Sequence, residues 1–243
     1  MSLPPSNKPR IQGNTLFLGD SITVGMPGFV GVDGQTSILA EGGKTADWLL
    51  GKLRGIEKLG ALDGPDRPQN VVVLIGTNDV GGGRSIQAIF SDITAIWSIA
   101  RDHGARVVAV TLPPFKGWAN YGSRYGDINA RRMALNALIV TSSIPDQTVL
   151  LDRLVADPAD PERLAKSYDG GDHLHLQKPA LAALLQAQIV GGGRGIPQPV
   201  SPVGPARIEP PTPAGGSLLS YLLVGLAAVS GIAVLTRKRN KQT

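Results

Sequence analysis

Short apolar runs of strand length alternate with longer stretches of helical spacing from about residue 14 to residue 190. The strand-like runs are "TLFLGD", "NVVVLIGTND", "ARVVAVTLPP" and "QTVLLD", and the helix-like stretches lie near 45–59, 84–103, 127–142 and 177–190. Val and Leu on both faces of the runs indicate a sheet covered on both sides, and the alternation indicates parallel pairing through right-handed crossovers. The pattern predicts an α/β fold: a doubly wound, three-layer α/β/α domain with a mainly parallel central sheet.

The composition changes outside that segment. Residues 1–13 are polar and Pro-rich and lack the apolar core of a secretory signal, so we expect an N-terminal extension ahead of a domain at 14–190. Residues 191–217 are rich in Pro and Gly, which predicts a semi-extended linker.

An uncharged apolar stretch follows that linker. As a helix rising about 1.5 Å per residue, "LLSYLLVGLAAVSGIAVL" reaches roughly 27 Å, close to the hydrocarbon thickness of a bilayer. We predict a transmembrane helix at 218–236 and a basic tail at 237–243. The alternative, a buried core helix, would have to return across the linker. Ala227 and Gly231 form a small-residue pair that favours a weak homodimer through this helix.

The side of the membrane that carries the domain stays open. A cytoplasmic basic tail would place the domain outside, but the N-terminus shows no export signal. A tail-anchored chain needs no signal, yet it moves four positive charges across the bilayer. We therefore expect a single-pass membrane protein with a C-terminal anchor, in either orientation.

Charge and cysteine content narrow the function classes. The formal net charge is +5, but four of the positive charges lie in the last seven residues, so nucleic-acid binding has little support. The chain has no cysteine, which excludes disulfides, Cys-ligated zinc and thiol catalysis. Arg84 stands where a phosphate loop would need lysine, which argues against nucleotide binding. We predict no cofactor and no metal.

Polar residues follow two of the strand-like runs. Ser21 comes directly after "LGD", and Asn78 and Asp79 end "IGTND". Because ligands bind beyond the carboxyl ends of strands in such sheets, these residues are candidates for chemistry, although each is also an ordinary turn or cap residue.

An acid and an imidazole lie three residues apart near the end of the domain. Asp172 and His175 stand just before a helical stretch, and this spacing allows the carboxylate to reach Nδ1 while Nε2 faces a nucleophile. His173 and His103 are interpreted as structural, and for His103 no partner is evident in the sequence.

Together these motifs resemble the SGNH, or GDSL-type, serine hydrolases, with "GDS", a Gly in "EGGKTADW", "GTND" and D-x-x-H in the family's order over roughly 14–190. The resemblance implies a flavodoxin-like SGNH fold in which Ser21 is the nucleophile, His175 the base and Asp172 its partner. It also implies an oxyanion hole built from the backbone N–H groups of Ser21 and Gly43 and the side-chain amide of Asn78. Gly42 competes with Gly43 because the glycines are tandem. Ile22 replaces the motif's Leu, a change that concerns packing only.

These residue types suit the implied chemistry. A serine hydroxyl becomes nucleophilic when a base takes its proton, and uncharged N–H donors stabilise the oxyanion of acyl transfer. Asp20 and Asp79 are expected to hold their turns rather than to react.

The prediction of the substrate rests on the segment 113–127. It follows a strand and contains Trp118, Tyr121 and Arg124, which we expect to line the acyl or alcohol pocket, with an ordinary surface loop as the alternative. A pocket with an aromatic rim suits a sugar ring, and the sequence shows no long apolar segment that could form a lid over a fatty acyl chain.

We therefore expect a membrane-anchored serine ester hydrolase that acts on short-acyl (O-acetyl) esters of carbohydrate or peptidoglycan. The alternatives are a lipase, lysophospholipase or thioesterase of the same fold and, in another class, a catalytically silent membrane-tethered binding module.

Overall fold

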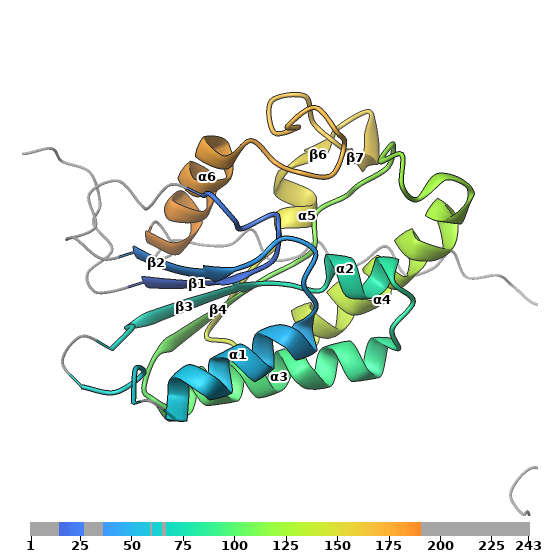
Figure 1. The fold of residues 1–243 in the computed structure, drawn as a ribbon. Coiled ribbons are helices and arrows are strands. Elements are labelled where there is room, and N and C mark those ends of the chain that lie inside the picture. The colour runs from blue at the N-terminus through green and yellow to red at the C-terminus, as the bar shows by residue number, and fades with distance from the viewer. Residues whose placement is uncertain (1–14, 27–35, 59, 65–66, 191–243) are drawn as a thin grey trace, which may run out of the picture. The chain divides into compact units, whose positions relative to one another are not determined.

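Five parallel strands form the central sheet of the computed structural model, which describes residues 15–26, 36–58, 60–64 and 67–190. The strands are β1 (Thr15–Gly19), β2 (Thr36–Ala40), β3 (Asn70–Leu74), β4 (Arg106–Val110) and β5 (Gln147–Val149), in the order β2-β1-β3-β4-β5. Every neighbouring pair is parallel, which confirms the predicted α/β sheet (Figure 1).

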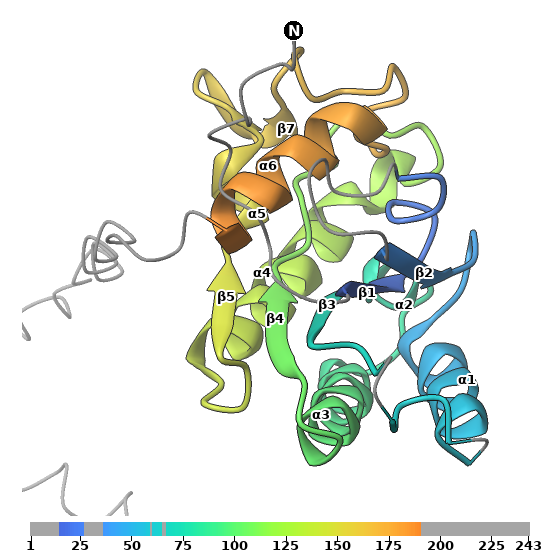
Figure 2. The same cartoon turned by 90° about the vertical axis from the view of Figure 1, so that its left-hand side faces the viewer.

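Helices cover both faces of this sheet. The long helices are α1 (Ala46–Lys58), α3 (Ile86–Asp102), α4 (Tyr125–Thr141) and α6 (Lys178–Val190), and their bounds fall within two residues of the predicted ones. Helices α1 and α3 lie together on one face and α6 lies on the opposite face, as Figures 1 and 2 show. The three-layer arrangement predicted from the alternation of strands and helices is therefore present.

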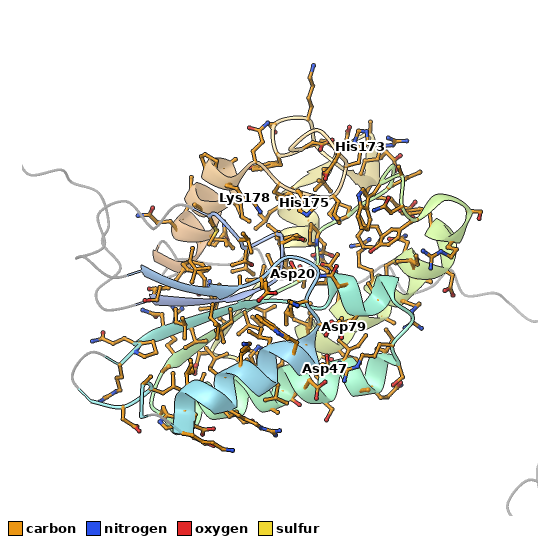
Figure 3. The ribbon with its side chains drawn as sticks, in the orientation of Figure 1. Asp20, Asp47, Asp79, His173, His175 and Lys178 are labelled. Atoms are coloured by element: carbon orange, nitrogen blue, oxygen red, sulfur yellow. The ribbon has the colours of Figure 1, made fainter. Side chains whose placement is uncertain are left out.

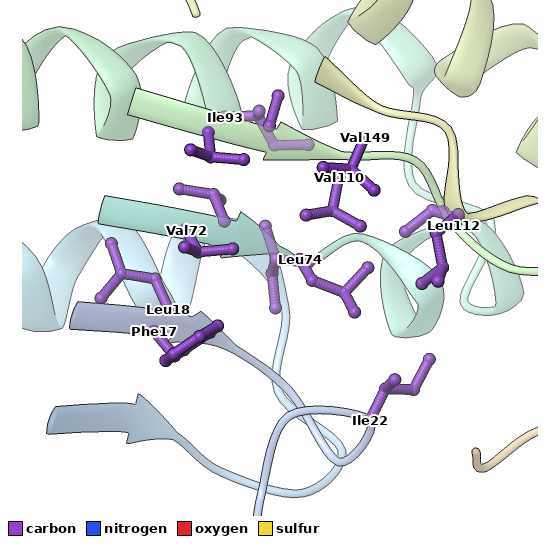
Figure 4. Close-up of a cluster of buried hydrophobic side chains, with 14 of the residues drawn as sticks. Phe17, Leu18, Ile22, Val72, Leu74, Ile93, Val110, Leu112 and Val149 are labelled. Carbon is purple, nitrogen blue, oxygen red and sulfur yellow. The ribbon is translucent and has the colours of Figure 1, made fainter. Parts of the chain in front are cut away.

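The sheet is buried because its strands carry apolar residues on both faces. All five residues of β1 and all five of β3 are buried, as expected for central parallel strands. Figure 4 shows Phe17, Leu18 and Val72 among the side chains that fill the layer between sheet and helices. This packed layer makes the strand ends a rigid platform for whatever they carry.

Several short elements were not predicted. Strand β2 lies at one edge of the sheet, and a two-stranded antiparallel hairpin joins β6 (Ala156–Asp157) to β7 (Asp160–Leu164). The short helices α2 (Thr77–Gly81) and α5 (Leu151–Leu154) and the 3-10 helix η1 (Gly122–Arg124) were also missed. None of these segments carries the continuous apolar run or the helical spacing by which the other elements were predicted.

The predicted extension, linker, transmembrane helix and basic tail lie outside the described residues. Among the residues that the structure does describe, no helix combines the length and the apolarity needed to cross a bilayer.

Candidate active site

The candidate site lies where the central strands end. The last residues of β1 and β3, Gly19 and Leu74, are register partners, so the segments that follow them leave the sheet at the same edge. Gly19 allows a close approach there, because a Cβ at this position would lie 2.6 Å from the Leu74 carbonyl oxygen and 2.1 Å from the Thr23 hydroxyl oxygen. The chain can therefore turn sharply and place Asp20 and Ser21 directly beyond the strand.

Ser21, His175 and Asp172 form one hydrogen-bonded series. His175 Nε2 lies 2.8 Å from the Ser21 hydroxyl oxygen, and His175 Nδ1 lies 2.6 Å from an Asp172 carboxylate oxygen. The other Asp172 oxygen accepts the backbone N–H groups of His175 and Leu174 at 2.8 and 3.0 Å. The structure thus brings the three sequence-predicted residues together, with the imidazole between the hydroxyl and the carboxylate.

The surroundings keep Asp172 ionised. Partial burial alone would raise its pKa, but the hydrogen bonds from the His175 ring and from the two backbone N–H groups hold the pKa of this carboxyl below its usual value. An ionised Asp172 can stabilise a proton on His175.

Asn78 and the tandem glycines border the turn that carries Ser21. The Asn78 side-chain amide donates to the Lys44 carbonyl at 2.9 Å and makes a longer contact of 3.4 Å with Asp20. A Cβ on Gly42 would lie 3.8 Å from the Ser21 Cβ, whereas Gly43 takes the left-handed conformation at φ +76°. The 42–44 turn therefore borders the Ser21 side chain, and both glycines are candidates for the backbone donor.

Asp79 fixes the helix that carries Asn78. Its buried carboxylate accepts the Ala46 backbone N–H at 2.9 Å and the Arg84 guanidinium at 2.9 Å, and Arg84 in turn binds Asp92 at 2.5 Å. Burial raises the pKa of Asp79, and the bond from Arg84 opposes that shift. This network ties α2 to the start of α1 and to α3.

Asp20 is, like Asp79, a buried carboxyl at the site, with 1% of its surface exposed. One of its oxygens accepts the Ile22 backbone N–H at 3.0 Å and the other faces the Asn78 amide. Burial raises its pKa to about 6, although the bond from Ile22 works in the opposite direction.

Lys178 was not among the predicted site residues. It is the first residue of α6, and its Nζ donates to the backbone carbonyls of both Ser21 and Ile22 at 2.6 Å. Figure 3 shows Lys178, His175 and Asp20 near the end of β1. One feature of the sequence points to Lys178: it is a lysine at the start of a helix, where the helix dipole disfavours a cation.

His173 forms a second imidazole–carboxylate pair in the same loop. Its Nδ1 lies 2.6 Å from an Asp169 oxygen, and its backbone N–H donates to the other oxygen at 3.0 Å. Among the described residues it is the one non-glycine residue with a left-handed backbone, at φ +66°. Its ring lies against Gly117. His175, and not His173, is the imidazole hydrogen-bonded to Ser21.

His103 has partners that the sequence did not reveal. Its Nδ1 lies 2.8 Å from Asp63 and its Nε2 lies 3.2 Å from Glu57. These bonds connect the end of α3 to α1 and to the turn that follows α1. Within the described residues no group of three or more His, Asp or Glu side chains could hold a metal ion.

The three predicted substrate-binding residues lie in different settings. Tyr121 is only 6% exposed, packs edge-on against Phe115 and Trp118, and donates its hydroxyl to the Thr77 carbonyl at 3.4 Å. This placement does not favour the prediction that Tyr121 lines a pocket, because its ring supports the start of α2 instead. Trp118 is half-buried, and Arg124 is exposed and donates to the Asn120 carbonyl at 3.4 Å.

Comparison with known proteins places the chain in a family. Residues 17–179 match the model of the GDSL-like lipase/acylhydrolase family. No curated protein sequence matches significantly.

Several solved structures share the fold. A Streptococcus pneumonia protein named after platelet activating factor is 25% identical, with a TM-score of 0.55 over 74% of this chain and 83% of that one. A GDSL-like lipase from Bacteroides thetaiotaomicron is 20% identical, with a TM-score of 0.57 over 80% of this chain and 93% of that one. A lipolytic G-D-S-L protein from Veillonella parvula is 16% identical, with a TM-score of 0.53 over 76% of this chain and all of that one. The chain therefore belongs to the GDSL-like lipase/acylhydrolase family and is a carboxylic ester hydrolase.

Proposed function

We propose that this protein hydrolyses short-acyl esters through a Ser21–His175–Asp172 triad and an acyl-enzyme intermediate. The observation that carries the proposal is the pair of hydrogen bonds on the His175 ring, 2.8 Å to the Ser21 hydroxyl and 2.6 Å to Asp172. An imidazole held in this way has the tautomer that accepts a proton at Nε2.

In the first half-reaction the Ser21 oxygen attacks the ester carbonyl carbon while its proton passes to His175 Nε2. The tetrahedral intermediate collapses when the bond to the alcohol oxygen breaks, and His175 gives its proton to that oxygen. In the second half-reaction a water molecule loses a proton to His175 and attacks the acyl-enzyme, which releases the acid and restores the Ser21 hydroxyl.

The oxyanion is assigned to the backbone N–H groups of Ser21 and Gly43 and to the Asn78 amide, with Gly42 as the alternative backbone donor. One Asn78 N–H is engaged by the Lys44 carbonyl at 2.9 Å, whereas the contact with Asp20 at 3.4 Å is long. The second N–H is therefore not held by a strong bond and is the one assigned to the developing negative charge.

The substrate proposal is an O-acetyl or other short-acyl ester on a carbohydrate or peptidoglycan. It is supported by the exposure of the described residues around the hydroxyl: the side chains of His175 and Asp172 are 33% and 45% exposed, and Gly42 and Gly43 are exposed. An exposed reaction centre suits an ester carried by a bulky polymer, whereas a long acyl chain needs an apolar channel to cover it.

Hydrolysis of p-nitrophenyl esters by the full chain tests both parts of the proposal. We expect acetyl ester turnover that is lost in Ser21→Ala, with Ser123→Ala, an exposed serine of η1, as the matched control. Equal rates for the wild type and Ser21→Ala would overturn the esterase proposal and favour a silent binding module. Much faster turnover of octanoyl than of acetyl esters would instead favour a lipase or thioesterase.

We also propose that residues 218–236 anchor the enzyme in a membrane, on the strength of their uncharged apolar sequence and the basic residues that follow. Extraction of the full chain from membranes by detergent but not by alkaline carbonate supports this anchor, and release by carbonate contradicts it. Protease accessibility in intact cells then decides which side carries the hydrolase domain.

A further inference from the structure

We propose that Lys178 is a positioning residue of the esterase site, which holds the Ser21 backbone against His175. This inference rests on the proposed function of Ser21 and adds a residue outside the triad and the oxyanion hole. Four features of the structure carry it: the bonds made by the ammonium, the opposing bond made by Asp20, the place of Lys178 in the chain, and its charge surroundings.

The Lys178 ammonium joins two consecutive peptide groups of the nucleophile turn. Its Nζ lies 2.6 Å from the carbonyl oxygens of both Ser21 and Ile22. Bonds of this length from an ammonium are charge-assisted and are stronger than bonds between neutral groups. Rotation of either peptide group would break one of them, so the ammonium restricts the backbone on both sides of the Ser21–Ile22 link.

Asp20 holds the same peptide group from its other end. The peptide that joins Ser21 to Ile22 presents its carbonyl to Lys178 and its N–H to the Asp20 carboxylate at 3.0 Å. A cation therefore binds the negative end of this peptide dipole and an anion binds the positive end. The Ser21 Cα lies next to this doubly bound group, so both charges restrict the direction in which its Cα–Cβ bond leaves the backbone.

The position of Lys178 in the chain couples this contact to the base. His175 contacts the Ser21 hydroxyl, and Lys178, three residues later, contacts the Ser21 carbonyl. One short segment thus holds the nucleophile at two points, its side chain and its backbone. Any shift of the segment moves the imidazole and the ammonium together, which preserves the distance between Nε2 and the hydroxyl.

A purely structural role would not require a lysine at this place. Lys178 begins α6, where the helix dipole disfavours a cation, and it is half-buried, so burial lowers its pKa. The ionisable groups that face it are Asp20 and Asp172, while His175 and Asp79 act on Asp20 in turn. The rest of α6 carries no charged side chain. The ammonium is therefore stabilised by the carboxylates of the site itself.

The test compares Lys178→Met, Lys178→Arg and the control Lys166→Met, an exposed lysine of the loop before the site, in the full chain. With p-nitrophenyl acetate, Lys178→Met is expected to lower kcat by about 10- to 100-fold, because a small displacement of a reacting group costs up to that factor. KM should change less than about threefold, because substrate contacts remain. Lys166→Met should match the wild type in both constants.

The pH profile separates positioning by a charge from simple packing. Loss of the cation raises the pKa of every ionisable group beside it, so the acid limb of kcat/KM moves to higher pH in Lys178→Met. Lys178→Arg keeps the charge, and its acid limb stays at the wild-type position. Identical limbs in the wild type and Lys178→Met would show that the charge is irrelevant.

Amide hydrogen exchange of the peptide spanning Ser21–Val24 tests the contact between Lys178 and the Ser21 turn without a measurement of activity. In Lys178→Met the amides of this peptide should exchange faster than in the wild type, whereas the amides of α3 should exchange at the wild-type rate. Exchange unchanged at Ser21–Val24, or kcat within about twofold of the wild type, overturns this inference. If the wild type shows no esterase activity, the proposed function fails and the exchange result alone decides the role of Lys178. Should Lys178→Met not fold, Lys178→Gln, whose uncharged amide nitrogen lies one bond closer to the backbone than the ammonium, takes its place with the same expected outcomes.

Discussion

Replacement of Asp20 by asparagine should stabilise the protein at neutral pH while impairing the esterase. The carboxyl is 1% exposed, and burial raises its pKa from 3.8 to about 6. A shift of roughly 2 units corresponds to about 3 kcal/mol of unfolding free energy, lost when the group is ionised in both states. Asparagine keeps an oxygen that can accept the Ile22 N–H but carries no charge to bury.

The sign of the pH dependence follows from the raised pKa. Between about pH 4 and pH 6 the folded state holds the proton that the unfolded state has already lost, so wild-type stability falls as pH rises through this window. Below pH 4 the carboxyl is protonated in both states and the penalty is absent. The advantage of Asp20→Asn should therefore be near zero at pH 3.5 and grow to about 3 kcal/mol at pH 7.

Urea unfolding of both proteins at pH 3.5 and pH 7 measures this difference, with the exposed Asp102→Asn as a control for charge removal alone. Turnover of p-nitrophenyl acetate should fall in the same variant, because the anion opposite Lys178 is lost. An Asp20→Asn protein that is less stable than the wild type at pH 7, or whose advantage is equal at both pH values, would refute burial of this charge as a destabilising feature. Confirmation would identify Asp20 as a site where stability is sacrificed for activity.

Three further outcomes are expected. His175→Gln should lower kcat by about 10³-fold or more, whereas His173→Gln should leave kcat near the wild-type value, because of the two imidazoles it is that of His175 that is hydrogen-bonded to Ser21. Equal losses of p-nitrophenyl acetate turnover in the two variants would contradict this. Asn78→Ala should lower kcat by about 10²- to 10³-fold with little change in KM if its amide binds the oxyanion, and a change confined to KM would argue against that role. Gly19→Ala should destabilise the fold by about 2 kcal/mol or more, because its Cβ would lie 2.6 Å from the carbonyl oxygen of Leu74 in the neighbouring strand. A thermal unfolding midpoint equal to that of the wild type would contradict this contact.

The sequence predicted the sheet and the meeting of its distant motifs because their physical basis is local. Apolar runs on both strand faces define buried parallel strands, and parallel strands bring their carboxyl ends to one edge. Ser21 and Asn78 follow two such strands, so the sheet alone brings Asn78 to the turn that carries Ser21, where it contacts Asp20. The i, i+3 spacing of Asp172 and His175 likewise fixed their contact within one turn.

Features that depend on tertiary contacts were not predictable. Tyr121 reads as an exposed loop aromatic, yet Phe115 and Trp118 enclose it and only 6% of it is exposed. The hydrogen bonds of His103 and Lys178 join residues 40 or more positions apart, and no local pattern encodes such pairs. The edge strand β2, "TSILA", has exposed and half-buried residues and lacks the continuous apolar run of the central strands, so its pattern is weak.

The order of the reacting groups along the chain has a consequence for biosynthesis. Ser21 follows the first strand by two residues, whereas its proposed base, His175, lies 154 residues later, just before the last described helix. A growing polypeptide therefore displays the hydroxyl throughout most of its synthesis without any means to activate it. Under the proposed mechanism, hydrolytic competence begins only when the segment from Asp172 to Lys178 has been made and lies beside the Ser21 turn, so chains that stop before it are expected to be inert toward esters.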